Sequence, residues 1–220
     1  MSGIKQKLFR DADGQYKDML DSVEGTTFIE SPIDFYIILS RYKFASKILS
    51  NKEKVIEVGC GHGYGSVMLS KYVESLVATD IDNELITACK KNFSSLGNCE
   101  FKTMDLLSPK SEDISKYDAL VSLDVIEHFE KNDINKAVEG YYSLLKKDGV
   151  AVIGTPNINS QPYASARRKA SHPYEFSYEE FDKALSNKFE NVFIFSMTDE
   201  VVSTSFLELA WYFIAICVKS

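Results

Sequence analysis

The 220-residue sequence has few cysteines, histidines and prolines: four, three and five respectively. Cys60, Cys89, Cys99 and Cys217 are scattered and form no C-x-x-C pair. This spacing argues against a zinc site built on cysteines and against a disulfide framework. We therefore expect four reduced thiols in a cytoplasmic protein.

An excess of positive charge is also lacking. The chain has 25 Lys and Arg against 32 Asp and Glu, a formal net charge of −7. A general nucleic-acid binder would normally show a basic face, so no nucleic-acid partner is predicted. The only compact basic run, 167–169, is interpreted first as a solvated loop.

Long hydrophobic runs are absent as well. The N-terminal residues lack the apolar stretch of a secretory signal. The apolar segment 207–218 contains Glu208 and is too short to span a bilayer, so it is interpreted as a buried strand. No membrane partner is predicted.

What the chain does have is enough apolar sequence, 45% of its residues, for one substantial domain. We expect an N-terminal arm over 1–32 and a single domain over 33–220. Within that domain, apolar residues recur at helical spacing over 32–49, with Ser31 as a candidate N-cap. This helix is expected either to pack on the sheet or to close over a ligand.

The most informative stretch is 55–65, in which an apolar run stops in alternating glycines and helix-like sequence follows. In an α/β sheet such a junction is a ligand site, because glycines let the backbone approach and a helix N-terminus offers free N–H groups. The dinucleotide pattern G-x-G-x-x-G fails, since Tyr64 or Ser66 occupies its last position. A nicotinamide-dependent oxidoreductase is therefore only the less favoured alternative.

The segment from Glu57 to Gly63, E-V-G-C-G-H-G, resembles motif I of the class I S-adenosylmethionine-dependent methyltransferases. The resemblance implies a Rossmann-like α/β fold. Its doubly wound seven-stranded sheet is mostly parallel with an antiparallel last strand, and helices cover both faces. It also implies S-adenosylmethionine as cofactor and S-adenosylhomocysteine as product. Glu57 suits the ammonium of that cofactor, and the turn N–H groups suit its carboxylate.

Two aspartates strengthen this interpretation. Asp80 ends a predicted strand about 20 residues after the first glycine, where a carboxylate can accept from both ribose hydroxyls. Asp105 follows the next predicted strand, and the resemblance implies that it accepts from the adenine amino group. The complete expected cofactor set is Glu57, Gly59, Cys60, Gly61, Gly63, Asp80, Ile81, Met104, Asp105, Leu106 and Leu123.

A second signal lies at 117–129, where an apolar strand runs into Asp124 and then Glu127-His128. This resembles the fourth-strand motif of small-molecule methyltransferases, and the Asn/Asp-Pro-Pro-Tyr motif of base-modifying enzymes is absent. His128 and His172 are the candidate catalytic bases, because imidazole titrates near neutrality. Glu127 and His128 can contribute to a divalent metal site, but no further ligands stand at a recognisable spacing, so no metal is predicted.

The remaining sequence predicts a helix over 132–147, a strand over 150–154, a polar loop over 158–170 and a helix capped by Ser177 and Glu180. Thr-Pro-Asn at 155–157 and His-x-x-Glu-Phe at 172–176 resemble a methyltransferase group that often accompanies polysaccharide biosynthesis. The resemblance implies O-methylation of a sugar, a sugar nucleotide or a phosphorylated precursor. From its place on the loop after the fifth strand, the basic run at 167–169 is expected to meet a phosphate of such a substrate. A methyltransferase acting on protein or RNA is the alternative. The sequence does not name the acceptor, choose oxygen over nitrogen or predict the oligomeric state.

Overall fold

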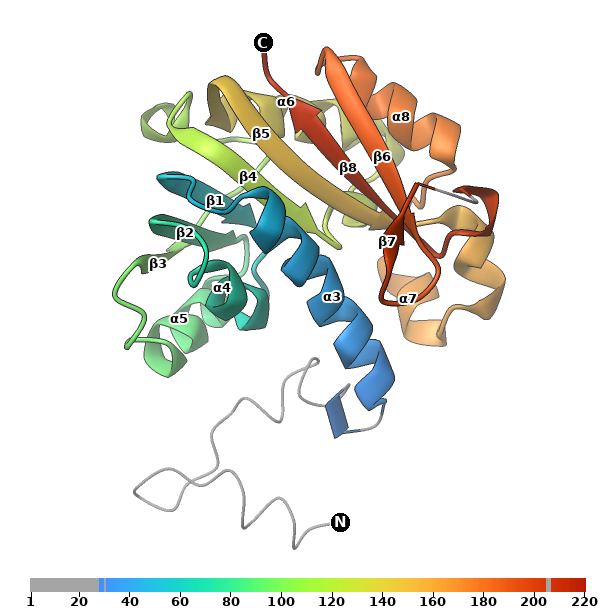
Figure 1. The fold of residues 1–220 in the computed structure, drawn as a ribbon, viewed down its shortest axis with the longest axis horizontal. Coiled ribbons are helices and arrows are strands. Elements are labelled where there is room, and N and C mark those ends of the chain that lie inside the picture. Colours follow the sequence, from blue (N-terminus) through green and yellow to red (C-terminus); the bar gives the residue numbers. More distant parts are fainter. Residues whose placement is uncertain (1–27, 30, 205–206) are drawn as a thin grey trace, which may run out of the picture.

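The computed structural model describes residues 28–29, 31–204 and 207–220, so most of the predicted arm lies outside the described residues. Its centre is an eight-stranded sheet in the order β3-β2-β1-β4-β5-β8-β6-β7 (Figure 1). The strands are β1 (Lys54–Val58), β2 (Ser75–Asp80), β3 (Cys99–Thr103), β4 (Tyr117–Leu123), β5 (Leu145–Pro156), β6 (Asn191–Met197), β7 (Val202–Ser203) and β8 (Tyr212–Val218). The helices are α3 (Pro32–Ile48), α4 (Tyr64–Leu69), α5 (Asn83–Asn92), α6 (Ile134–Leu144), α7 (Ala166–Ser171) and α8 (Tyr178–Ser186).

The predicted fold class is confirmed. Strands β3, β2, β1, β4 and β5 pair in parallel, and β8 is antiparallel to both of its neighbours, β5 and β6. The one addition is the two-residue strand β7, which pairs antiparallel with β6 at the edge of the sheet.

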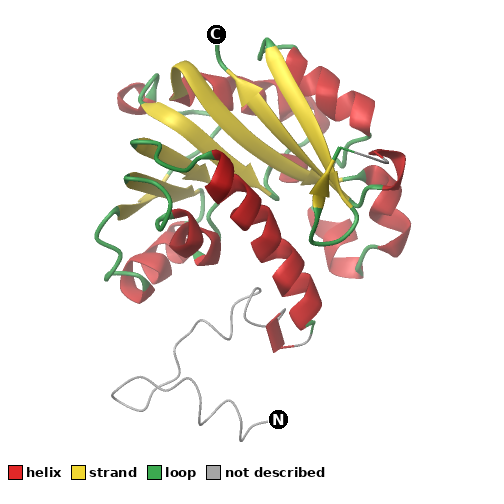
Figure 2. Ribbon diagram, viewed as in Figure 1, coloured by secondary structure: helices red, strands yellow, loops and turns green. Residues whose placement is uncertain are grey.

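Helices cover both faces of the sheet (Figure 2). Alternate residues of each central strand point to opposite faces. Val55 packs with α3 and α4 on one face, whereas Ile56 packs with α6 and α8 on the other. The central strands are therefore buried on both sides, which explains their nearly continuous apolar sequence.

Three predicted boundaries are corrected. The apolar segment 207–218 forms a strand only from Tyr212 onward, because Leu207–Leu209 form a 3₁₀ helix. Helix α6 ends at Leu144 and not at 147, because Leu145 is fully buried, takes an extended backbone and pairs with Tyr117. Lys146 then lies in β5, where its ammonium contacts Asp118 at 2.7 Å.

The predicted loop at 158–170 is the third correction. It contains a 3₁₀ helix at Ile158–Tyr163 and the first five residues of α7, whose N-cap Ser165 accepts from the Arg168 N–H. The capping box of α8, by contrast, is present as predicted between Ser177 and Glu180. None of the described helices is both long and apolar enough to cross a membrane.

Candidate active site

A cavity of about 670 Å³ opens at the carboxyl ends of β1, β2, β3 and β4, where the strand order reverses between β1 and β4. Helix α3 forms its remaining wall through Phe35, Ile38, Leu39, Arg41 and Tyr42. This reversal is the usual ligand site of an open α/β sheet, and the volume lies within the range of small-molecule sites.

The glycine turn after β1 forms the floor of the cavity. Gly59 has φ +79°, and a Cβ there would lie 2.2 Å from the Val125 side chain. The Gly61 N–H donates to Asp80 Oδ2 at 3.0 Å, and the Asp82 N–H donates to Asp80 Oδ1 at 3.0 Å. The Asp80 carboxylate is thus held in place between the turn and the start of α5, with each oxygen retaining capacity for a further donor.

Nine of the eleven residues expected to bind cofactor line this cavity. They are Gly59, Cys60, Gly61, Asp80, Ile81, Met104, Asp105, Leu106 and Leu123. Asp105 is exposed, and one of its oxygens accepts from the Leu107 N–H at 2.9 Å. Ile81 is 70% exposed, so a flat apolar ligand group can cover it.

Glu57 and Gly63 are not among the residues that line the cavity, so their expected contact with cofactor stays a prediction. The Glu57 side chain is buried behind the turn and accepts a hydrogen bond from the Ser66 hydroxyl of α4. Burial raises the pKa of Glu57 to about 7, although the hydrogen bonds from Ser66 and Tyr42 oppose that shift. Gly63 is the N-cap of α4, and a Cβ there would point at Phe93, away from the cavity.

Arg41 is a cavity residue that the sequence did not single out. Its Nη1 donates to both Asp124 oxygens at 2.9 and 2.8 Å, and its guanidinium lies 3.7 Å from the Tyr212 ring centroid. The Arg41 Nε atom is buried and has no hydrogen-bond partner. Asp124 has φ +58°, and its N–H donates to the Tyr212 hydroxyl at 3.2 Å. Arg41 therefore ties α3 to the end of β4.

The two candidate bases come together at the β4 end of the cavity. The rings of His128 and His172 meet edge to face with centroids 4.8 Å apart. His128 lines the cavity, on a 3₁₀ helix at Ile126–His128, whereas His172 is contributed by the segment after α7. Buried Glu127 joins them, and one potential ligand atom from each of the three lies within 4.8 Å of the others. The structure thus brings a third group, His172, to the Glu127-His128 pair.

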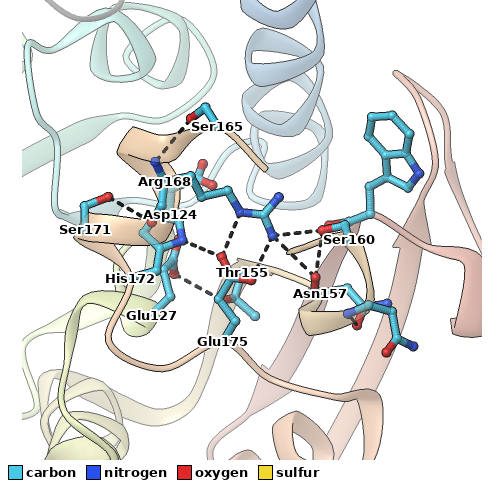
Figure 3. A network of polar contacts seen from close by, with 12 residues as sticks. Asp124, Glu127, Thr155, Asn157, Ser160, Ser165, Arg168, Ser171, His172 and Glu175 are labelled. Atoms are coloured by element: carbon cyan, nitrogen blue, oxygen red, sulfur yellow. Dashed lines mark hydrogen bonds and ion pairs between the residues drawn. The ribbon is translucent and has the colours of Figure 1, made fainter. Parts of the chain in front are cut away.

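Behind His172 lies an ion pair between buried Glu175 and partly buried Arg168, which the sequence did not predict (Figure 3). Arg168 donates to the Glu175 carboxylate through Nε at 2.7 Å and Nη2 at 3.0 Å, and to the Ser160 hydroxyl at 2.8 Å. His172 Nδ1 lies 2.7 Å from Glu175 Oε1. Burial lowers the pKa of His172, and the hydrogen bond to Glu175 opposes that shift. Arg168 is therefore held toward Glu175 and Ser160 through Nε and Nη2. The expected contact of the basic run with a substrate phosphate stays a prediction.

The sequence of this chain is similar to those of known methyltransferases. A family model described as "Methyltransferase domain" matches residues 55–149. The ubiquinone biosynthesis O-methyltransferase of Pelagibacter ubique is 29% identical over 114 residues, which cover 51% of this chain and 46% of that protein. The matched part thus spans about half of that relative.

Solved structures agree in fold. The methyltransferase domain of bacterial CtHen1 superposes with a TM-score of 0.68 at 18% identity, covering 84% of this chain and 99% of that domain. The N-methyltransferase NodS from Bradyrhizobium japonicum, in complex with S-adenosylhomocysteine, gives a TM-score of 0.62 at 14% identity over 99% of this chain and 95% of that one. At these identities the likeness shows the fold alone.

Proposed function

We propose, from the premise that this chain carries an S-adenosylmethionine-dependent methyltransferase domain, that it transfers a methyl group to a small-molecule acceptor. The observation that carries the proposal is the cavity at the strand reversal, in which the glycine turn and Asp80 face one ligand site. In this assignment Asp80 accepts from the ribose hydroxyls, and Ile81 and Met104 flank the adenine. Glu57 accepts a hydrogen bond from Ser66 and so holds the start of α4 in place behind the glycine turn.

Methyl transfer is an in-line displacement. The acceptor lone pair forms a bond to the methyl carbon while the carbon–sulfur bond breaks, and its electron pair stays on the sulfur of S-adenosylhomocysteine. The protein must hold the acceptor atom about 3 Å from that carbon with the sulfur behind it. A hydroxyl acceptor also loses a proton, for which His128 and His172 are the candidate bases.

The acceptor class rests on the sequence resemblance. We assign a sugar, a sugar nucleotide or a phosphorylated polysaccharide precursor as first choice, with oxygen as the acceptor atom. Since Arg168 is engaged by Glu175, Lys169 is the described residue of the basic run that remains exposed for a phosphate. The four cysteines are free, which supports a cytoplasmic setting.

Two other functions remain weaker. A protein or RNA acceptor is disfavoured by the net charge of −7. An oxidoreductase lacks the third glycine that a pyrophosphate site requires.

The test is isothermal titration of the full chain with S-adenosylmethionine and S-adenosylhomocysteine. Asp80→Ala is expected to weaken both ligands by about 10- to 100-fold, because hydrogen bonds to a charged group contribute about 1.5–3 kcal/mol. The matched control is Asp118→Ala, since Asp118 pairs with Lys146 and does not line the cavity. Absence of binding to the wild type, or an equal effect of both variants, would overturn the proposal.

A further inference from the structure

The cluster of Glu127, His128 and His172 has a property that methyl transfer alone does not require: its potential metal-ligand atoms lie close together. One potential ligand atom from each residue lies within 4.8 Å of the other two. Two imidazoles and a carboxylate are a frequent ligand set for divalent first-row transition metals.

The hydrogen bonds fix which imidazole nitrogen is available. His128 Nδ1 lies 2.7 Å from the Ser171 carbonyl oxygen, which can only accept, so Nδ1 carries the proton. His172 Nδ1 lies 2.7 Å from Glu175 Oε1, and the carboxylate is held by two hydrogen bonds from Arg168. Both rings are therefore left with an Nε2 lone pair, the form in which histidine binds a metal.

Glu127 supplies the third donor. Its side chain is completely buried; Oε2 accepts from the Thr155 hydroxyl at 3.1 Å, whereas Oε1 is buried with no hydrogen-bond partner. An unpaired buried carboxylate oxygen is costly unless something occupies it. A cation beside the two histidines would satisfy it.

The surroundings match those of metal-binding histidines in general. Such residues usually donate their second N–H to a carboxylate or a backbone carbonyl, which fixes the tautomer and orients the ring. Here the Ser171 carbonyl fills this place for His128. Glu175 fills it for His172, and Arg168 in turn donates to Glu175 (Figure 3).

We propose that Glu127, His128 and His172 bind a divalent first-row transition cation at the acceptor end of the cavity. Mg²⁺ and Ca²⁺ prefer all-oxygen sets, so Mn²⁺, Co²⁺ or Zn²⁺ fits this mixed set better. The three protein ligands leave coordination positions open for an acceptor. A hydroxyl coordinated there is more acidic, so its proton leaves more readily to solvent before the oxygen attacks the methyl carbon. This role, though not the binding itself, rests on the proposed methyl transfer and points to a hydroxylated acceptor.

The test is direct metal binding by the full chain after treatment with a chelator. Co²⁺ is titrated by visible absorption and Mn²⁺ by calorimetry, with wild type, His172→Ala, Glu127→Gln and His62→Ala. We expect one ion per chain, with affinity reduced at least tenfold in His172→Ala and Glu127→Gln. His62 is the only other histidine of the chain and serves as the matched control, so His62→Ala should bind as the wild type does.

S-adenosylhomocysteine titration of the same variants separates the possible failures. If the His172→Ala variant still binds S-adenosylhomocysteine, it is folded. A loss of metal binding in that variant then supports the proposed site. Equal metal affinity in wild type, His172→Ala and Glu127→Gln, or no metal binding by the wild type, would overturn it. Metal binding without any cofactor binding would leave the site standing and overturn the proposed function instead.

Glu175→Gln tests the arrangement behind the ligands. Loss of the charged partner of His172 should weaken metal affinity by about 10- to 100-fold while leaving cofactor affinity unchanged. Metal affinity equal to that of the wild type would contradict the assigned role of Glu175.

Discussion

At the scale of single residues, Glu57 shows how burial raises the pKa of a carboxyl group. Its carboxyl lies behind the glycine turn, where burial raises its pKa from 4.5 to about 7. Between these two values the unfolded chain has released the proton and the folded chain retains it. The unfolded state then binds fewer protons, so the free energy of unfolding falls as pH rises.

Glu57→Gln should remove this pH dependence, because the amide is neutral and can still accept from Ser66. The stability of the wild type relative to Glu57→Gln is expected to fall by about 3 kcal/mol from pH 4.5 to pH 7 and then to level off. Urea unfolding of both proteins without ligand, at several pH values, measures the difference. A constant difference across that range would show that Glu57 does not titrate in the folded state as assigned.

At the scale of elements, the ion pair between Arg168 and Glu175 connects α7 to the segment before α8. The Glu175 side chain is fully buried, and Arg168 also donates to Ser160 in the preceding 3₁₀ helix. Removing one partner of a buried pair leaves the other charge uncompensated, which typically costs about 3–5 kcal/mol.

Arg168→Met is therefore expected to lower the free energy of unfolding by about 3 kcal/mol, whereas Lys169→Met, at an exposed position, should change it little. Chemical denaturation measures both. The double variant Arg168→Met/Glu175→Gln should recover part of the loss, because the buried charge is gone. If Arg168→Met is as stable as Lys169→Met, the pair does not hold this region together.

The same elements show what the sequence could and could not predict. Strand β1 and the glycine turn were predicted because an apolar run followed by glycines has few alternative structures. The end of α6 was predicted too late, because Lys146 and Lys147 are typical of a helix C-terminus. Only the pairing of Leu145 with Tyr117 shows that these two lysines lie outside the helix. Tertiary contacts decided that boundary.

The grouping of residues at the acceptor end of the site was even harder to predict from the sequence. His172 lies far along the chain from Glu127 and His128, and no spacing rule joins them. What brings them together is α7, whose stability depends on the Ser165 cap and on Arg168 reaching Glu175. A polar sequence without helical spacing of apolar residues does not predict such a helix, so this segment was predicted as a loop.

At the scale of the whole molecule, α3 packs on the sheet through its C-terminal part and lines the cavity with its middle residues. It is 17 residues long, but only Ser40, Ala45 and Ser46 are buried along it, and its cavity side includes Phe35 and Leu39. The contacts that hold it at the cavity include the ion pair of Arg41 with Asp124 and the ring contact of Phe35 with Tyr64. A helix with so little buried surface is expected to open locally more often than the core strands.

Cofactor binding should therefore protect α3 more than the rest of the chain. A ligand in the cavity covers the exposed side of this helix, and every local opening must first release the ligand. Hydrogen exchange with and without S-adenosylhomocysteine should show amide protection across 35–45 rising by at least about tenfold. Helix α8, which does not line the cavity, is the internal control and should respond less.

The Arg41→Met variant, which loses the ion pair with Asp124, should show faster amide exchange across α3 before ligand is added. Equal protection of α3 and α8 would mean that the ligand stabilises the fold as a whole and that α3 does not close over it.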